Sequence, residues 1–408
     1  QQMSSQGLRV IAVCFAVFED KDNIPAQITD CRLRFAGLVG LADPPRGSIR
    51  EDIKECIRAG IRVVMITGDN GITASAIASE IGMENCGKVI TGDEIDSLSD
   101  EELSKKIKDV SIFARVVPEH KMRIVKAFKE SGEVVAMTGD GVNDAPALKY
   151  ADIGIAMGKR GSEVSREAAG LILMDDNFST IVDTIKDGRR IFDNIRKAVG
   201  YVFTIHAPIA LASLLAPLLK INPGFLMLLP FHVVLLELVI DPTCSVVLER
   251  QPAEKNIMSR PPQKPNEKIL NAAILVKSVI QGLVIFAVSF GTYYYLLKTS
   301  GNAETARTMG LVIILISNLL LVLENSSNID SAFVSAKLLV RDKVFWAVNI
   351  GTVLLLLVML YTPLSQFLSL AALKPGELLA CAGLAFISVM WYEAVKIIRR
   401  KRFSRQSI

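Results

Sequence analysis

The stretch Met137-Thr-Gly-Asp-Gly-Val-Asn-Asp-Ala-Pro-Ala147 decides how the rest of this chain is interpreted. An apolar run precedes it and predicts a buried strand, and its two glycines allow a sharp turn directly after that strand. The side chains of Asp140, Asn143 and Asp144 then follow at the strand's carboxyl end, where α/β sheets bind ligands. Two carboxylates and an amide suit Mg²⁺ held beside a phosphate, whereas the alternative interpretation is an Asx-rich surface turn.

The residues around this stretch alternate between short apolar runs and amphipathic segments. Buried strands are expected at residues 35–41, 61–66, 112–116, 134–137, 153–157 and 171–174, with helices between them. Such alternation predicts a parallel sheet covered by helices on both faces, an α/β fold. Residues 8–18 form one more buried element, which is either a strand or a short helix.

A second polar loop, Thr67-Gly68-Asp69, also follows an apolar run and should lie beside the first loop in one sheet. Its hydroxyl and backbone N–H groups can hold phosphate oxygens. Lys121 falls near the start of a predicted helix between the two loops, where its charge can serve a phosphoryl group. A lone lysine on an amphipathic helix would otherwise be solvated surface.

The second half of the chain is apolar. A helix from residue 178 to residue 197 continues into six segments of about the 20 residues that a bilayer requires. These segments are residues 198–219, 225–248, 270–297, 308–324, 344–370 and 378–397. Lys and Arg concentrate in the loops at 249–268 and 337–343 and in the tail, which predicts that these parts and the soluble domain are cytoplasmic.

Charge and cysteine content exclude other classes of protein. The net charge of +4 is small and dispersed, so no nucleic-acid partner is expected. The six cysteines show no paired spacing, which favours reduced thiols over a disulfide framework or a zinc site.

Ionisable residues inside the predicted spans point to a cation site. Glu237 and Asp241 are four residues apart and therefore share one helix face. His206 lies in the preceding span, and Pro242 frees a backbone carbonyl beside Asp241. Charged groups within a bilayer are costly, so a transported cation is the default interpretation of this set. In the fourth span, Asn318 is either another oxygen ligand or a helix–helix hydrogen bond.

An alternative activity depends on Asp20 and Asp22. A strand followed by Asp-x-Asp is the nucleophile motif of haloacid-dehalogenase phosphatases, which would make the chain a membrane-tethered phosphatase. The residues that follow, Asn-Ile-Pro, differ from the small or hydroxyl residues expected after such a nucleophile, and a charged loop is favoured.

Five motifs together resemble those of P-type ATPases. In chain order they are Asp43-Pro-Pro-Arg46, Met65-Ile-Thr-Gly-Asp-Asn70, Phe113-Ala-Arg-Val-Val-Pro-Glu-His-Lys121, Met137-Thr-Gly-Asp-Gly-Val-Asn-Asp-Ala-Pro146 and Ile153-Gly-Ile-Ala-Met-Gly158. The chain looks like the carboxyl-terminal part of a prokaryotic, P2 (calcium-type) cation pump, and the resemblance covers nearly all of it. It implies an α/β haloacid-dehalogenase-like (Rossmannoid) parallel-sheet domain followed by an all-α membrane domain of six transmembrane helices.

The resemblance also implies domain limits and ligands. Residues 1–32 would end the nucleotide-binding domain, residues 33–190 would form most of the phosphorylation domain, and residues 191–408 would be the membrane domain. Mg²⁺ and ATP are the implied cofactors, a cation and a lipid bilayer the implied partners, and a bacterial plasma membrane the implied location.

Site residues carry over from the same motifs. Asp140 would bind Mg²⁺ and Asp144 would support its loop. Lys121 and Thr67 would hold the phosphoryl group. The residues that would line the nucleotide–phosphate site are Arg9, Gly68, Asp69, Arg115 and Asn143.

Two departures limit what this polypeptide can do alone. The family's phosphorylated aspartate lies in Asp-Lys-Thr-Gly-Thr, a string that this sequence lacks. We therefore expect a missing amino-terminal part and no turnover by the isolated chain, or a non-catalytic truncated remnant. The calcium pumps that the chain resembles carry an Asn and a Glu in the first of these spans, where this sequence has His206 and Ile209. In the second span they carry an Asn and a Thr, where this sequence has Glu237 and Ile240. A full two-calcium site is not expected; one divalent ion, a monovalent ion or a proton remain open.

Overall fold

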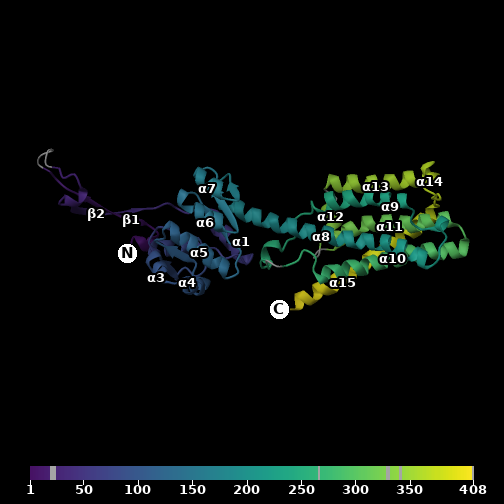
Figure 1. Ribbon diagram of the computed structural model, residues 1–408, viewed down its shortest axis with the longest axis horizontal. Helices are drawn as coiled ribbons and strands as arrows, with labels where there is room; N and C mark the ends of the chain where they lie inside the picture. The colour runs from purple at the N-terminus through teal and green to yellow at the C-terminus, as the bar shows by residue number, and fades with distance from the viewer. Residues whose placement is uncertain (19–23, 265–266, 328–330, 340–341, 407–408) are drawn as a thin grey trace. The chain divides into compact units, whose positions relative to one another are not determined.

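The computed structural model describes residues 1–18, 24–264, 267–327, 331–339 and 342–406. The chain divides into two compact units (Figure 1). The first contains residues 1–186 and 256–265, and the second contains residues 187–255 and 266–408. The first carries all the strands, and the second is helical.

An antiparallel hairpin begins the first unit. Strands β1 (Arg9–Phe15) and β2 (Arg34–Leu41) pair from Arg9 opposite Leu41 to Phe15 opposite Arg34. The sequence predicted β2 as the first strand of the parallel sheet, and this placement is wrong. Parallel neighbours need a crossover connection of a dozen or more residues, usually a helix, whereas the described part of the β1–β2 connection holds only a single 3₁₀ turn, Ile28–Asp30.

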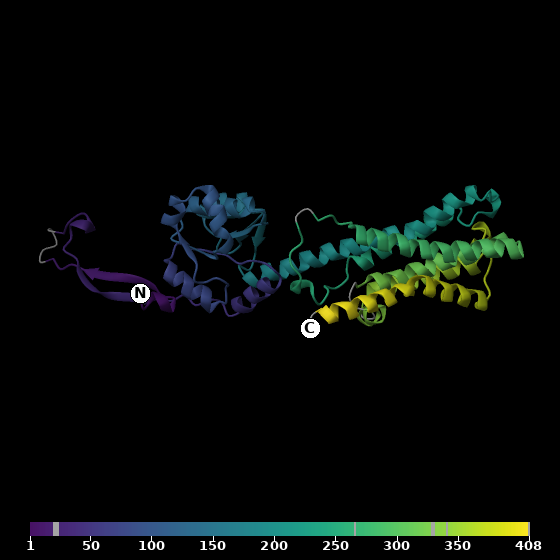
Figure 2. The same cartoon turned by 90° about the horizontal axis from the view of Figure 1, so that it is seen from below.

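The remaining described strands form two three-stranded parallel sheets rather than the single sheet expected. Figure 2 shows helices on opposite sides of this part of the chain. The order in the first sheet is β3 (Met65–Ile66), β5 (Ile112–Ala114), β4 (Val89–Thr91). In the second it is β6 (Ala136–Gly139), β7 (Ile153–Met157), β8 (Leu171–Leu173). The α/β class is confirmed. Strands β3 and β6, which lead into the two polar loops, are both edge strands.

Helices cover these sheets. They are α1 (Ile49–Arg58), α2 (Gly71–Glu80), α3 (Gly92–Ser97), α4 (Asp100–Lys106), α5 (Pro118–Glu130), α6 (Ala145–Tyr150) and α7 (Glu163–Ala168). Helix α5 serves both sheets, because Ile124 packs in the core beside β5 while its neighbour Val125 packs beside β6 and Met137. Ile66 of β3 and Val135, just before β6, contact both of these cores.

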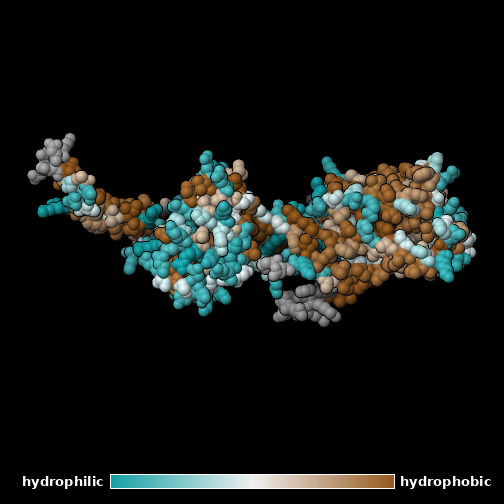
Figure 3. Space-filling model, in the orientation of Figure 1, coloured by the Kyte–Doolittle hydropathy of each residue, from teal (hydrophilic) through white to brown (hydrophobic). Residues whose placement is uncertain are grey.

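Six helices of the described residues are long and apolar enough to cross a membrane, which confirms the predicted number; the first of them begins at the end of the first unit, and the other five lie in the second. They are α8 (Phe178–Leu218), α9 (Pro230–Pro242) with the π-helical turn η7 (Thr243–Leu248), α10 (Ala272–Ser300), α11 (Ala303–Asn325), α13 (Lys343–Tyr361) and α15 (Pro375–Gln406). Figure 3 shows the apolar surface over these helices. The fifth span is shorter than expected because Pro363 disfavours helix at Thr362, and a short helix, α14 (Leu364–Phe367), follows.

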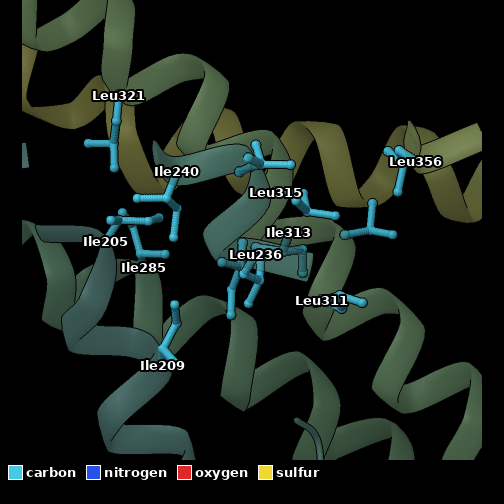
Figure 4. Close-up of a cluster of buried hydrophobic side chains, with 14 of the residues drawn as sticks. Ile205, Ile209, Leu236, Ile240, Ile285, Leu311, Ile313, Leu315, Leu321 and Leu356 are labelled. Atoms are coloured by element: carbon cyan, nitrogen blue, oxygen red, sulfur yellow. The ribbon is translucent and has the colours of Figure 1, made fainter. Parts of the chain in front are cut away.

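Helix α11 lies at the centre of the membrane bundle. Its most apolar window is 78% buried, against 28–44% for the other spans. Figure 4 shows Leu315 and Leu321 of α11 among Ile205 of α8, Ile240 of α9 and Ile285 of α10. The helices therefore share one continuous apolar core.

Candidate functional site

Asp144 organises the loop after β6. Its Oδ2 atom accepts the backbone N–H groups of Asp140 and Gly141 at 3.3 and 3.2 Å. A Cβ atom on Gly139 would lie 2.5 Å from the Asp144 Cβ, so only glycine fits there. Asp144 is buried whereas Asp140 and Asn143 are exposed. The loop thus holds one carboxylate as an internal support and presents a second carboxylate and an amide outward.

Two serines that were not predicted as site residues, Ser162 and Ser165, form hydrogen bonds with the backbone of Asp140. The Asp140 carbonyl oxygen accepts the N–H of Ser162 at 2.8 Å and the hydroxyl of Ser165 at 3.2 Å. Ser165 is fully buried, and Ser162 is the N-cap of α7. The capping pattern before α7 was the available signal in the sequence.

Lys121 connects the two sheets. It lies in the first turn of α5, which follows β5, and its ammonium group makes a short ion pair with Oδ1 of Asp144, which follows β6. The structure therefore brings together four of the predicted site residues, Lys121, Asp140, Asn143 and Asp144. A cationic group beside two carboxylates suits a site for a metal-bound phosphoryl group.

The loop after β3 is held by hydrogen bonds within itself and to the neighbouring strand end. The N–H of Asp69 donates to Oγ1 of Thr67 at 3.1 Å, and the N–H of Arg115 donates to the Asp69 carbonyl at 3.0 Å. Gly68 between them is exposed. Arg115 has φ of 52°, an uncommon backbone conformation for a residue with a side chain, and such conformations concentrate at functional sites.

Arg9 reaches this loop from the hairpin. Its Nε lies 3.7 Å from Oδ1 of Asp69, and the side chain is 74% exposed. The contact is a weak surface pair. It places the predicted nucleotide contact beside Thr67 and Asp69, so the predicted residues form two groups, one after each edge strand.

The donor set after β6 fits Mg²⁺. Carboxylate and amide oxygens are hard ligands, and Mg²⁺ usually binds one or two carboxylates while keeping water and phosphate oxygens. Asp140 and Asn143 supply such oxygens. Within the described ranges, no three His, Cys, Asp or Glu side chains converge on a metal site of their own. The alternative nucleophiles, Asp20 and Asp22, lie outside the described residues.

In the second unit, the structure pairs two of the predicted cation ligands. Nε2 of His206 lies 3.1 Å from Oε1 of Glu237, and the Nδ1 of His206 lies 2.8 Å from the Val202 carbonyl. The ring of His206 thus contacts its own helix through one nitrogen and the Glu237 carboxylate of α9 through the other.

Asp241 lies one turn beyond Glu237 and is exposed. Directly after it the helix changes to the π-helical turn η7 at Thr243, a local feature common at functional sites. Across the bundle, the Tyr201 hydroxyl donates to Oδ1 of Asn318, whose buried Nδ2 has no hydrogen-bond partner among the described residues. Asn318 thus makes the helix–helix hydrogen bond that was one of its two predicted roles.

Comparisons with known proteins identify both halves of the chain. Residues 225–398 match the family described as "Cation transporting ATPase, C-terminus", and residues 16–152 match the haloacid dehalogenase-like hydrolases. The chain is 36% identical over 405 residues to a calcium-transporting ATPase of Bacillus subtilis (strain 168), which covers 98% of the chain and 45% of that protein.

Other relatives give the same picture. A calcium-transporting ATPase of Listeria monocytogenes is 36% identical over 99% of the chain and 45% of its own length. The calcium-transporting ATPase type 2C member 1 of Bos taurus is 33% identical over 98% of the chain and 41% of its own length. The chain therefore spans less than half the length of these relatives. It belongs to the P-type cation-transporting ATPases and corresponds to their carboxyl-terminal part.

Proposed function

We propose that this chain forms the phosphoryl-transfer and cation-translocating part of an ATP-driven pump whose amino-terminal part supplies the phosphorylated aspartate. The observation that carries the proposal is the convergence of Lys121, Asp140 and Asp144 at the carboxyl end of β6, with Thr67 at the end of β3. This arrangement can hold a phosphoryl group and its metal, and the sequence lacks the Asp-Lys-Thr-Gly-Thr string that would supply the phosphorylated aspartate.

The two edge strands indicate where the strand that carries this nucleophile would pair. Strands β3 and β6 are at the edges of separate sheets. Met65 and Ile66 of β3 are only partly covered and Ala136 of β6 is exposed, whereas Met137 of β6 is buried. Ile66 and Val135 contact the same apolar cores. An unpaired parallel strand edge is exposed backbone that a further strand can satisfy. We propose that a strand ending in the absent Asp-Lys-Thr-Gly-Thr sequence inserts between β3 and β6.

In the proposed phosphoryl transfer, each residue of this chain has one task. The incoming aspartate carboxylate attacks the γ-phosphorus of ATP and ADP leaves; water later cleaves the resulting acyl phosphate. Lys121 neutralises phosphoryl oxygens, and the Thr67 hydroxyl and nearby N–H groups orient them. Mg²⁺ held by Asp140 and Asn143 would supply further charge neutralisation on those oxygens. Arg9, Gly68, Asp69 and Arg115 line the nucleotide side.

Helix α8 offers the mechanical connection. Two hydrogen bonds fix its start to the phosphoryl-transfer domain, residues 33–190. In its first turn the Ser179 hydroxyl donates to Oδ2 of Asp52 at 2.7 Å, and just before the helix the Asp176 carbonyl accepts from Arg46. The same helix continues without interruption to His206. Movement of the domain would then reach the cation site through one helix. We propose the division into residues 1–32, 33–190 and 191–408 on this basis.

The transported ion is a cation bound between α8 and α9. Glu237 and Asp241 provide the carboxylates, and the π-helical turn begins at Thr243, two residues beyond Asp241. His206 positions Glu237. The relatives are named as calcium transporters, and a single divalent cation matches two carboxylates. We propose a bacterial plasma membrane, with the phosphoryl-transfer domain and the carboxyl tail in the cytoplasm, because Lys and Arg concentrate on that side.

Transport by the assembled protein tests this function. The chain, co-expressed with the amino-terminal half from the same genome and placed in proteoliposomes, should hydrolyse ATP in response to a divalent cation and accumulate that cation. Asp140→Asn should abolish both, and the chain alone should do neither. Cation-independent hydrolysis by the wild-type assembly would refute the pump.

A further inference from the structure

A histidine that the proposed mechanism does not use closes the amino-terminal turn of α5. The N–H of Val117 donates to Nδ1 of His120 at 3.3 Å. Because Nδ1 accepts, the ring proton lies on Nε2, which donates to Oδ1 of Asp96 at 2.8 Å. His120 is only 5% exposed. Its ring thus joins helix α3, which carries Asp96, to a backbone N–H that would otherwise lack a partner at the start of α5.

The packing around the ring allows little adjustment. A Cβ atom on Gly92, the first residue of α3, would lie 2.4 Å from the Arg115 carbonyl oxygen and 3.0 Å from the His120 ring. Glycine is therefore needed where α3 begins, since it lets the helix approach the ring closely. Arg115 belongs to the loop beside Thr67 and Asp69, so the same contact borders the nucleotide side of the site.

We infer that Asp96 and His120 are positioning residues for Lys121. Lys121 follows His120 directly, in the turn that this hydrogen-bond chain fixes, and its ammonium group must reach Asp144 across the site. If the turn frays, the lysine backbone moves and the charge no longer sits over the phosphoryl oxygens. This inference rests on the proposed phosphoryl-transfer function and adds a second layer of residues to its site.

A neighbouring contact separates positioning from plain stability. Arg123, two residues beyond Lys121, also ties α5 to α3: it donates to the Ile95 and Leu98 carbonyls at 2.9 and 2.8 Å. Arg123 does not touch the first turn's N–H groups in these contacts. If His120 only supports α3–α5 packing, Arg123→Ala and His120→Ala should behave alike. If His120 positions Lys121, only His120→Ala should weaken the binding of phosphate.

The test is phosphoenzyme formation from inorganic phosphate and Mg²⁺ by the chain assembled with the amino-terminal half. His120→Ala should raise the phosphate concentration for half-maximal labelling about fivefold, the size of effect of one lost helix cap. His120→Gln, whose side-chain carbonyl can accept the Val117 N–H, should stay near wild type, as should Arg123→Ala. In a Lys121→Ala background, adding His120→Ala should change nothing further.

A readout on the chain alone accompanies it. Hydrogen exchange at the Val117 amide should speed up in His120→Ala and remain slow in His120→Gln. Equal phosphate dependence in His120→Ala and wild type would overturn the inference and leave the pump proposal standing. Equal losses in His120→Ala and Arg123→Ala, or a further loss in the Lys121→Ala background, would also overturn it. Absence of labelling in the wild-type assembly would instead overturn the proposed function, and the inference with it.

Discussion

Nε2 of His206 and Oε1 of Glu237 lie 3.1 Å apart between helices α8 and α9, and the other ring nitrogen of His206 faces the Val202 carbonyl. The histidine therefore contacts both helices, and in the proposed pump it orients the Glu237 carboxylate for the cation. Glu237→Gln removes a ligand charge and should abolish cation-stimulated ATP hydrolysis by the assembled pump. His206→Ala should keep hydrolysis but raise the cation concentration for half-maximal activity about tenfold, the usual cost of losing an outer-shell partner.

A titration of ATP hydrolysis against Ca²⁺ and other divalent cations measures both effects. Leu238→Ala, at a neighbouring exposed position on α9, is the control and should match wild type. A His206→Ala variant with unchanged cation affinity would show that the histidine does not hold Glu237.

The buried support of the Mg²⁺ loop gives a second prediction. Asp144→Asn keeps a hydrogen-bond acceptor for Asp140 and Gly141 but loses the charge that pairs with Lys121. Mg²⁺ affinity of the chain should fall modestly, about two- to tenfold, whereas Asp140→Asn should nearly eliminate it. Isothermal titration with Mg²⁺ and a phosphate analogue distinguishes them, and equal losses for the two variants would contradict these separate roles.

A charge cluster in the membrane unit predicts a large effect on stability. Glu324 of α11 is fully buried; Lys396 of α15 and Lys277 of α10 lie 3.1 and 3.4 Å from it, and Gln281 donates to its Oε2 at 3.1 Å. Glu324→Gln removes the buried carboxylate that Lys277 and Lys396 share, and it leaves Glu393 at 2.9 Å from Lys396. We expect this loss to cost about 3–5 kcal/mol of unfolding free energy. Adding Lys396→Met should recover part of that loss.

Denaturant unfolding in detergent micelles measures this cluster. Lys298→Met, at the other end of α10, is a matched control that should stay near wild type. A Glu324→Gln variant as stable as the native chain would show that the cluster does not hold the three helices together.

Asp152 predicts a pH dependence of the first unit. The Val135 N–H, which donates to Oδ2 of Asp152 at 2.9 Å, lowers the pKa of this carboxyl against the opposing effect of burial, and Lys129 adds to the lowering. A carboxyl with a depressed pKa stabilises the fold above its unfolded pKa of about 3.9 and loses that contribution as pH falls through the folded pKa. In the Asp152→Asn variant, the protection of the β6 amides from hydrogen exchange should therefore decrease less as the pH falls.

Hydrogen exchange of the β6 amides between about pH 5 and about pH 3 checks this, with intrinsic exchange rates corrected for pH. The asparagine still accepts the Val135 N–H, so the variant isolates the charge. Identical pH profiles for the variant and the native chain would exclude Asp152 as a source of the acid sensitivity.

Coupling through α8 predicts the effect of an insertion. Two glycines placed after Gly188 should break the continuous helix while leaving both units folded, because a side chain added at Gly188 meets no atom within 4 Å. ATP hydrolysis by the assembled pump should persist while cation accumulation per ATP falls. Gly188→Ala is the control and should stay coupled. Unchanged accumulation per ATP after the insertion would exclude α8 as the connection.

Long, strongly patterned elements could be predicted from the sequence, and short ones could not. The six spans follow directly from apolar length, and α5 from its Pro118 start. Strand β4 and helices α3 and α4 were missed because elements of three to seven residues carry too little periodicity. Two capping boxes, Thr91 with Glu94 and Ser99 with Glu102, were the signal that marks them.

The candidate site divides in the same way. Glycine-containing loops with clustered polar side chains can be recognised in a sequence, so Asp140, Asp144 and Thr67 could be predicted as site residues from the sequence. Supporting contacts depend on which distant segments meet in the fold. Ser165 beneath Asp140 and Asp96 against His120 therefore emerge only from the structure. The division into two sheets was also unforeseen, because strand pairing beyond nearest neighbours is not encoded locally.

The most direct test of the central claim is to express this chain and the amino-terminal half as two separate polypeptides and to label them with γ-³²P-ATP. The account predicts an acid-stable, hydroxylamine-sensitive label on the amino-terminal polypeptide, formed only when this chain is present and lost in Asp140→Asn. A label on this chain, or labelling of the amino-terminal polypeptide without it, would contradict the claim that the two halves build one phosphoryl-transfer site.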